Sequence, residues 1–332
     1  MEGHGSEVAP GLHRIEAPLG ERFVACYLVV GTKAALLLDA GVDDTPRGSL
    51  LPYLEHIGLP PARVRWIVIS HCDVDHMGGA VSARAAFPDS VIVAHAADRG
   101  LIEDVVRIVE ERYREFAVPH GIDIAPETIA WCHAVARAAP VDLAIEGRAT
   151  IDLGDRHVVI LPTPGHSPGS ISVHDPASGA VMTSDAVLGL TIHLRDGRPA
   201  FPPTYRHPGP YRDTVAALAD LEPTWLLTAH EPVMEADGAL AFLDASREFT
   251  DGLEATMLAE LESAPQPLSL RELIDRIAPR LGEWQPATFD LLAHPLLGHL
   301  EEATARGQLD LQPGPPARWR VANAGPSAAE EA

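Results

Sequence analysis

Short apolar segments separated by turn residues run through the first two thirds of the chain. Residues 23–40 form two apolar runs around Gly31, Thr32 and Lys33, and this pattern predicts a β-hairpin. Further short strands are predicted at 64–70, 91–95, 158–161, 171–174, 180–183 and 225–228. Helices are predicted at 46–58, where apolar positions have helical spacing, and at 78–87 and 211–221. The proline-dense segment 199–210 is expected to be a loop.

Two other segments have a different pattern. Residues 98–148 are rich in helical pattern and interrupt the strands, so we expect an insertion that covers one mouth of a site. Beyond about residue 255, a helix capped by Ser269, a helix at 291–306 that ends at Gly307, and two short strands form a helix–helix–wing pattern. We therefore expect a catalytic domain at 1–254, a winged-helix-like module at 255–321 and a disordered acidic tail at 322–332.

The chain is strongly acidic. Its 332 residues include 47 Asp and Glu against 25 Lys and Arg, a formal net charge of −22, while 46% of the residues are hydrophobic. Such a surface repels phosphate backbones and anionic lipid, which argues against a nucleic-acid or membrane partner. We expect a small-molecule substrate, with a homodimer as the candidate assembly.

Three cysteines, Cys26, Cys72 and Cys132, are an odd number without CxxC spacing, so a disulfide framework is not expected. Residues 1–10 lack the pattern of a secretory signal, and no apolar run approaches the roughly 20 residues of a membrane helix. These features favour a cytoplasmic enzyme.

Four residues of metal-ligand type lie within six positions directly after a predicted strand. They are His71, Asp73, Asp75 and His76. Alternate positions of an extended segment point to the same side, so the first three can converge, while His76 faces the other flank. Imidazoles and carboxylates together suit zinc, iron or manganese.

Single ligand-type residues also follow three later strands. His166, Asp185 and His230 each come near the end of a predicted strand, where sheets with covering helices place their sites. Chance polar residues at a helix start would explain the first run alone, but they do not explain this downstream set.

At this point the sequence resembles the metallo-β-lactamase-fold hydrolase superfamily, in its glyoxalase-II-like branch, over residues 12 to about 250. Five motifs occur in order: LLLDAG with Asp39, HxxxDH at 71–76, PGHSPGS with His166, SDA with Asp185 and TAH with His230. The resemblance implies an α+β fold, an αββα sandwich. The C-terminal segment is similar to the winged-helix module of some superfamily hydrolases.

The resemblance also implies two divalent metal ions, zinc or iron, with manganese as a further candidate. One ion would be held by His71, Asp73 and His166, and the other by Asp75, His76 and His230. Asp185 would bridge the two ions, and Asp39 would support the ligand loop without binding metal.

Asp73 departs from the usual family signature, HxHxDH, in which this position is histidine. A carboxylate here makes the first site harder and moves its preference from zinc toward iron or manganese. With two ions, a bridging hydroxide and three aspartates, the centre is neutral. Three interpretations are open: a dinuclear hydrolase, which we favour, a mononuclear enzyme at Asp75, His76 and His230, and an oxygen-using di-iron oxidoreductase.

The favoured function is hydrolysis of a small ester, thioester or lactone by a hydroxide generated at the metal centre, with Asp75 as the catalytic residue that orients it or relays a proton. A phosphodiesterase or nuclease is an alternative within the superfamily, as is a binding protein with a vestigial site.

Candidate substrate contacts are His193, Tyr205 and His207, which lie between the Asp185 and His230 motifs. We assign no site role to His294 or His299 in the C-terminal segment.

Overall fold

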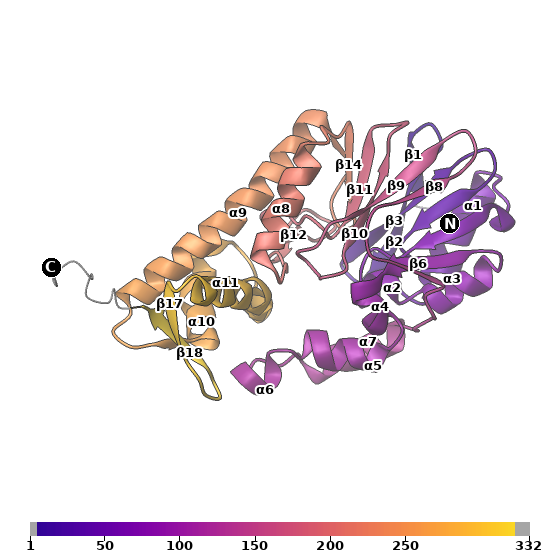
Figure 1. The fold of residues 1–332 in the computed structure, drawn as a ribbon. Coiled ribbons are helices and arrows are strands. Elements are labelled where there is room, and N and C mark those ends of the chain that lie inside the picture. The colour runs from indigo at the N-terminus through magenta and orange to yellow at the C-terminus, as the bar shows by residue number, and fades with distance from the viewer. Residues whose placement is uncertain (1–4, 323–332) are drawn as a thin grey trace.

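Two β-sheets face each other in the middle of the molecule, and helices cover the outer face of each sheet (Figure 1). The computed structural model describes residues 5–322, so the predicted tail lies, apart from Ala322, outside the described residues. This layering is the predicted αββα sandwich.

The first sheet has seven strands in sequence order. They are β1 (Gly5–Ala9), β2 (Leu12–Leu19), β3 (Arg22–Val30), β4 (Ala35–Leu38), β5 (Val64–Val68), β6 (Val91–His95) and β7 (Leu143–Ile145). Strands β1 to β4 pair antiparallel, and β4 to β7 pair parallel. The hairpin predicted at 23–40 is confirmed as β3 and β4.

The second sheet has six strands in the order β15-β14-β11-β10-β9-β8. Their bounds are β8 (Ala149–Asp152), β9 (His157–Pro162), β10 (Ile171–Asp175), β11 (Ala180–Ser184), β14 (Trp225–Thr228) and β15 (Met234–Glu235). Strands β11 and β14 are parallel neighbours, so their carboxyl ends lie at the same edge of the sheet.

Both faces of the central strands are buried, which explains their continuous apolar runs. In β4, Leu36 and Leu38 belong to the core between the two sheets. Leu37 points the other way and packs in the core beneath the helices of the first sheet. The two-residue alternation of a strand therefore supplies both layers from one short run.

Short helices accompany the first sheet. They are η1 (Pro46–Leu50), α1 (Leu51–His56), η2 (Pro61–Arg63), α2 (Val74–Met77), α3 (Ala80–Ala86) and α4 (Ala96–Ile102). The segment predicted as an insertion then contains α5 (Val105–Ile108), η3 (Val109–Tyr113), α6 (Ala117–His120) and α7 (Pro126–Val135). The helices predicted at 46–58 and 78–87 are confirmed.

Residues 199–210 are less irregular than predicted. They include β13 (Pro199–Phe201), which pairs with β12 (Ile192–His193), and the start of α8 (Pro208–Ala219). Pro208 stands in the first turn of α8, where a missing N–H costs nothing, so the proline that suggested a loop in fact begins a helix.

The long helix α9 (Ala236–Ser263) joins the second sheet to the C-terminal elements. These are β16 (Leu268–Ser269), α10 (Leu270–Leu281), η4 (Pro286–Leu292), α11 (Ala293–Ala305), β17 (Leu309–Gln312) and β18 (Arg318–Val321). Ser269 and Glu272 form a capping box at the start of α10, which confirms the predicted serine cap. The pairing of β17 with β18 confirms the two predicted short strands.

One apolar core extends from the second sheet into the C-terminal elements. Val181 and Leu226 of the sheet belong to the same cluster as Leu300 and Trp319. The predicted boundary after residue 254 falls inside α9, and the division into domains stays a prediction. Of the helices between residues 5 and 322, none combines the length and hydropathy that crossing a bilayer requires.

This shared core predicts that a cavity in the C-terminal segment destabilises the protein. Leu300→Ala removes a fully buried side chain and should lower the free energy of unfolding by about 2–5 kcal/mol. Leu240→Ala on exposed α9 surface is the control and should change it by less than about 0.5 kcal/mol. Denaturant unfolding measures both, and equal effects would show that α11 is not packed into the common core.

Candidate metal centre

The ligand-rich run connects β5 to α2. The backbone bends at His71 and Cys72, is extended at Asp73 and enters α2 at Val74. His71 and Asp73 therefore lie between the strand and the helix, whereas Asp75 and His76 belong to the helix. The extended alternation predicted for His71, Asp73 and Asp75 does not form, because the chain bends at His71 and the helix begins at Val74.

The other three candidate ligands reach the same place from the second sheet. His166 lies in the turn after β9, Asp185 follows β11 and His230 follows β14. The structure brings all seven predicted ligands together in three overlapping groups, each with ligand atoms within 4.8 Å of one another. The groups are His71, His76 and Asp185; His71, Asp73 and His166; and Asp75, His76 and His230.

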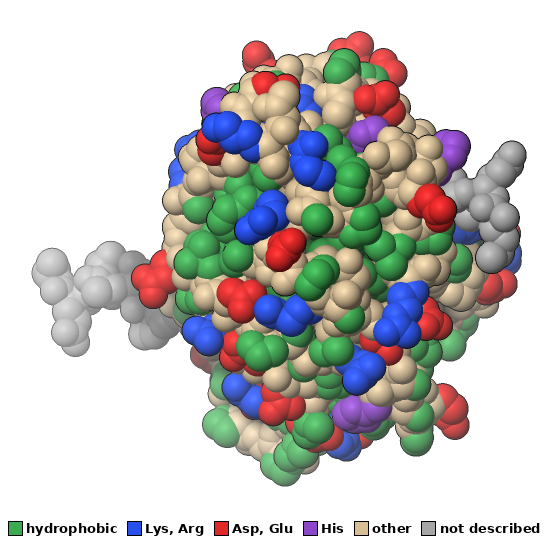
Figure 2. Space-filling model, turned by 90° about the vertical axis from the view of Figure 1, so that its right-hand side faces the viewer, with side chains coloured by type: hydrophobic (Ala, Val, Ile, Leu, Met, Phe, Trp, Pro, Cys, Tyr) green, Lys and Arg blue, Asp and Glu red, His purple; other side chains and the backbone are tan. Residues whose placement is uncertain are grey.

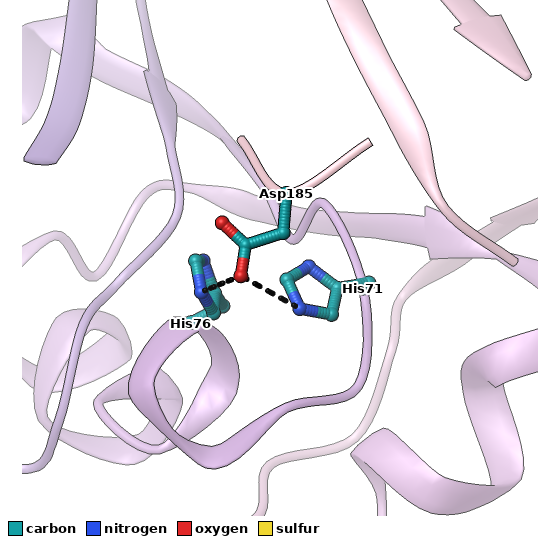
Figure 3. Close-up of side chains that lie close together, drawn as sticks. All are labelled: His71, His76 and Asp185. Atoms are coloured by element: carbon teal, nitrogen blue, oxygen red, sulfur yellow. Dashed lines mark ion pairs between the residues drawn. The ribbon is translucent and has the colours of Figure 1, made fainter. Parts of the chain in front are cut away.

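Asp185 lies between the imidazoles. Its Oδ2 is 3.4 Å from Nε2 of His76 and 4.0 Å from Nε2 of His71 (Figure 3). The same oxygen lies 3.4 Å from Nε2 of His230. Asp75 completes this side, 3.7 Å from His76 and 3.6 Å from His230.

Each of three imidazoles is oriented through its Nδ1 atom. Nδ1 of His71 lies 2.9 Å from Oγ of Ser70, and Nδ1 of His230 lies 2.9 Å from the carbonyl oxygen of Phe23. Nδ1 of His76 lies 3.0 Å from Oδ2 of Asp39. Such contacts fix the ring and leave Nε2 to face the centre, the arrangement common in metal sites.

Two buried carboxylates hold the ligand segments. Asp39 accepts hydrogen bonds from the N–H of Ser70 at 2.8 Å and from Oγ of Ser184 at 2.8 Å. Asp98 accepts from the N–H of Cys72 and from the backbone and side chain of the turn that carries His166. Asp39 supports the loop as predicted by the resemblance, whereas Asp98 was not anticipated.

Several buried polar atoms at the centre have no hydrogen-bond partner among the described residues. They are Nε2 of His71, Nε2 of His76 and Oδ1 of Asp185. Burial disfavours a charged imidazole, yet Asp185 and Asp75 outweigh it and raise the pKa of His76 well above its ordinary value. The residues around His76 therefore fit a divalent cation, since they combine free donor atoms with an uncompensated negative field.

Arg112 enters the other side of the centre, next to Asp73. Its Nη2 donates to Oδ2 of Asp73 at 2.9 Å, and its Nε donates to Oδ1. The same Nη2 lies 3.0 Å from Nε2 of His166. Burial alone would raise the pKa of Asp73, but Arg112 and the hydrogen bond from His166 hold it well below the usual range. Arg112 comes from η3 in the insertion and was not anticipated.

A cavity of about 210 Å³ lies over these residues. Its lining includes Asp75, Asp185 and His230 together with Arg22 and Arg112, and most of the lining surface is apolar. The apolar wall residues are Ile124, Trp131, Leu188, Ile192, Phe201 and Leu291. The segment 98–148 and the C-terminal segment therefore both contribute residues to the lining of this cavity, and the role of 98–148 as an inserted cover stays a prediction.

His294 of α11 also lines the cavity, although no role was assigned to it. It is 8% exposed, its Nδ1 has no partner among residues 5–322, and burial lowers its pKa well below the ordinary value. The C-terminal segment thus contributes an imidazole to the lining of the cavity. His299, by contrast, is buried against Tyr205 and away from the cavity lining.

The three predicted substrate residues lie outside this lining. Tyr205 is completely buried, and its hydroxyl pairs with His299, so the prediction that it contacts substrate is wrong. His193 lines a separate cavity of about 280 Å³ that His230 also borders, and it pairs with Glu231 at 2.9 Å. His207 occupies the position before the first residue of α8 without a side-chain capping hydrogen bond, and its role stays a prediction.

Comparison with known sequences agrees with this geometry. The family described as the Metallo-beta-lactamase superfamily matches residues 19–230. The chain belongs to this superfamily. All seven candidate ligands of this metallo-β-lactamase-fold protein lie within the matched segment.

Individual relatives are distant. The probable metallo-hydrolase YqgX of Bacillus subtilis is 24% identical over 171 residues, which are 52% of this chain and 69% of that protein. A hydroxyacylglutathione hydrolase of Mesorhizobium japonicum is 34% identical over 55 residues, 17% of this chain and 22% of that enzyme. A metallo-beta-lactamase family protein of Thermus thermophilus has a TM-score of 0.74 at 20% identity, over 95% of this chain and 100% of its own, which shows the fold.

The support that Asp39 gives to His76 leads to a prediction. Asp39→Asn removes the negative charge behind the imidazole and should weaken Zn²⁺ binding about 10–100-fold. Competition with a chromogenic chelator measures the affinity. Asp152→Asn, an exposed aspartate remote from the ligands, is the matched control and should leave the affinity unchanged. Equal affinity in Asp39→Asn and wild type would show that this contact does not tune the site.

Proposed function

We propose that this metallo-β-lactamase-fold protein is a metal-dependent hydrolase of small esters, thioesters or lactones. The observation that carries the proposal is the group of Asp75, His76, His230 and Asp185, whose donor atoms converge at the floor of a mainly apolar cavity. Two imidazoles and two carboxylates suit zinc or iron and also admit manganese. A divalent ion held there would lower the pKa of water to near neutrality and polarise an acyl oxygen.

The protein's own residues would position the reactants. Asp75 lies at the cavity floor, and its side chain is within 3.7 Å of both imidazoles of the group, so it can orient the attacking water and accept its proton. Apolar walls from the insertion and from β13 would hold the acyl chain and exclude bulk water. His294 would present a neutral imidazole to the polar end of the substrate.

The size and lining of the cavity favour a small acyl compound. A volume of about 210 Å³ admits a short chain, and most of the lining surface is apolar, although Arg22 and Arg112 also line the cavity. The local similarity to a hydroxyacylglutathione hydrolase supports a thioester among the candidates. The described part of the face in Figure 2 mixes acidic and basic side chains without a continuous basic surface. These features disfavour the alternative of a phosphodiesterase or nuclease.

The other alternative, an oxygen-using di-iron oxidoreductase, requires two neighbouring iron ions. The contact of Arg112 with both Asp73 and His166 counts against a second ion in that position. A hydrolase needs only one polarising ion, so the arginine does not weaken the hydrolytic proposal.

The proposal predicts metal-dependent hydrolysis in a panel of thioesters, lactones, aryl esters and phosphodiesters. Turnover should occur with an acyl substrate, and His230→Ala should lose bound metal and reduce kcat/KM by more than about 100-fold, because even supporting contacts of metal ligands contribute 10–100-fold. His157→Ala, an exposed histidine, is the matched control and should retain both.

Metal content is measured on the same preparations as turnover. Oxygen consumption without hydrolysis would contradict the proposal, as would full hydrolysis by His230→Ala without bound metal. Phosphodiester cleavage faster than acyl hydrolysis would move the function to the nuclease alternative.

A further inference from the structure

We propose that the guanidinium of Arg112 takes the place of the first metal ion, so that each chain holds one divalent ion, coordinated by Asp75, His76, His230 and Asp185. This inference rests on the proposed metal centre but not on the identity of the substrate. Of the interpretations left open by the sequence, this inference favours the mononuclear centre over the dinuclear one. The structural reason is the position of Arg112.

The ligand atoms of the first site are already used by Arg112. Both oxygens of Asp73 accept hydrogen bonds from the guanidinium, one from Nε and one from Nη2. Nε2 of His166 lies 3.0 Å from Nη2 of Arg112 and 2.8 Å from Oδ2 of Asp73. A planar fork that meets a carboxylate at two points is the strongest geometry for such a pair. An ion at this position would have to displace the arginine from two of its three ligands.

At the second site, formed by Asp75, His76, His230 and Asp185, the ligand atoms are not occupied by the side chain of any described arginine or lysine. Nε2 of His76 and Oδ1 of Asp185 are buried and have no partner in the part of the chain that the structure describes. No arginine or lysine side chain is paired with Asp75 or Asp185 among residues 5–322; their neighbours within 4.0 Å are imidazoles. His71, whose Nε2 is also unpartnered, groups with His76 and Asp185, so it can serve this same ion.

Arg112 is built into the structure rather than placed on the surface. Its side chain is 9% exposed, and its Nη1 also donates to the carbonyl oxygen of His166 at 3.3 Å. Tyr113, the residue after Arg112, accepts a hydrogen bond at its hydroxyl oxygen from the N–H of Val74 at the start of α2, at 2.9 Å. The helix that carries the arginine is thus fixed to the ligand run itself.

Counting charge favours one ion. Asp73, Asp75 and Asp185 carry three negative charges, which one divalent ion and Arg112 balance before any water ionises. A second divalent ion beside Arg112 would leave the centre with an excess of two positive charges before any water ionises, and of one with a bridging hydroxide. Burying an excess of charge is unfavourable, because the charge loses its solvation by water.

Metal stoichiometry tests the inference directly. Wild-type protein, stripped of metal and titrated with Zn²⁺ or Co²⁺, should bind one equivalent per chain, read by elemental analysis after dialysis and by the Co²⁺ absorption bands. His166→Ala should still bind one equivalent, whereas His230→Ala should lose it. Two equivalents in wild type, or loss of the only equivalent in His166→Ala, would overturn the inference.

Replacing the arginine provides a second test. Arg112→Met removes the guanidinium and frees Asp73 and His166, so it should raise the stoichiometry from one equivalent to two. Arg114→Met is the matched control, because Arg114 lies two residues away and pairs with Glu110 and Asp123 at the surface. It should remain at one. A folded Arg112→Met protein with a single equivalent would show that the guanidinium is not what excludes the second ion.

The two proposals fail in different ways. Wild-type protein that binds one ion but hydrolyses none of the acyl substrates supports this inference and contradicts the proposed function. Protein that hydrolyses acyl substrates with two bound ions supports the proposed function and contradicts this inference. If Arg112→Met does not fold, the wild-type and His166→Ala stoichiometries still decide the inference.

Discussion

The geometry of the candidate metal centre depends on the hydrogen bonds made by the buried carboxylate of Asp39. It connects the ligand run, through Ser70, with α2, through His76, and with the second sheet, through Ser184. Its backbone adopts a left-handed conformation, with φ of 66°, which a residue other than glycine seldom does. Burying a carboxylate is unfavourable in free energy unless it accepts hydrogen bonds, and these donors supply them. Because one donor, Ser184, comes from the second sheet, the Asp39–His76 pair and the strained backbone of Asp39 depend on the packing of the two sheets.

The Asp73–Arg112 pair applies the same constraint on the other side of the centre. Two unit charges 4 Å apart interact by about 4 kcal/mol at an effective dielectric constant of 20, so a divalent ion next to the guanidinium would be repelled by about twice that amount. Asp73 therefore has one cationic partner or the other. Arg112 is part of the same chain, so its guanidinium is always close to Asp73. The occupancy of a metal ion at that position depends instead on the concentration of free metal in solution.

The positions of the candidate ligands could be predicted from the sequence because they follow strands whose apolar pattern is simple. His166, Asp185 and His230 each come after a short buried strand, and parallel pairing of β11 with β14 places two of them at one edge. Arg112 carries no such signal. It lies 39 residues after Asp73 in a helical segment rich in charge, and only the folding of the insertion back over the sheet brings the two together. His294 and the extent of α9 were missed for the same reason, since both depend on how the C-terminal segment packs.

Asp73 shows why residue type alone left the number of ions open. A carboxylate can bind a divalent ion or pair with an arginine. Both interactions involve the same two oxygen atoms, and both can occur at a buried position. In sequence, three aspartates and two ions with a hydroxide gave a neutral centre, which made the dinuclear interpretation self-consistent. With the guanidinium included, one ion gives a neutral centre before any water ionises, and two ions with a hydroxide give an excess of one positive charge. The arginine thus changes the ion count without changing any ligand, and it leaves Asp75, His76, His230 and Asp185 as the part of the centre that is free to act on a substrate.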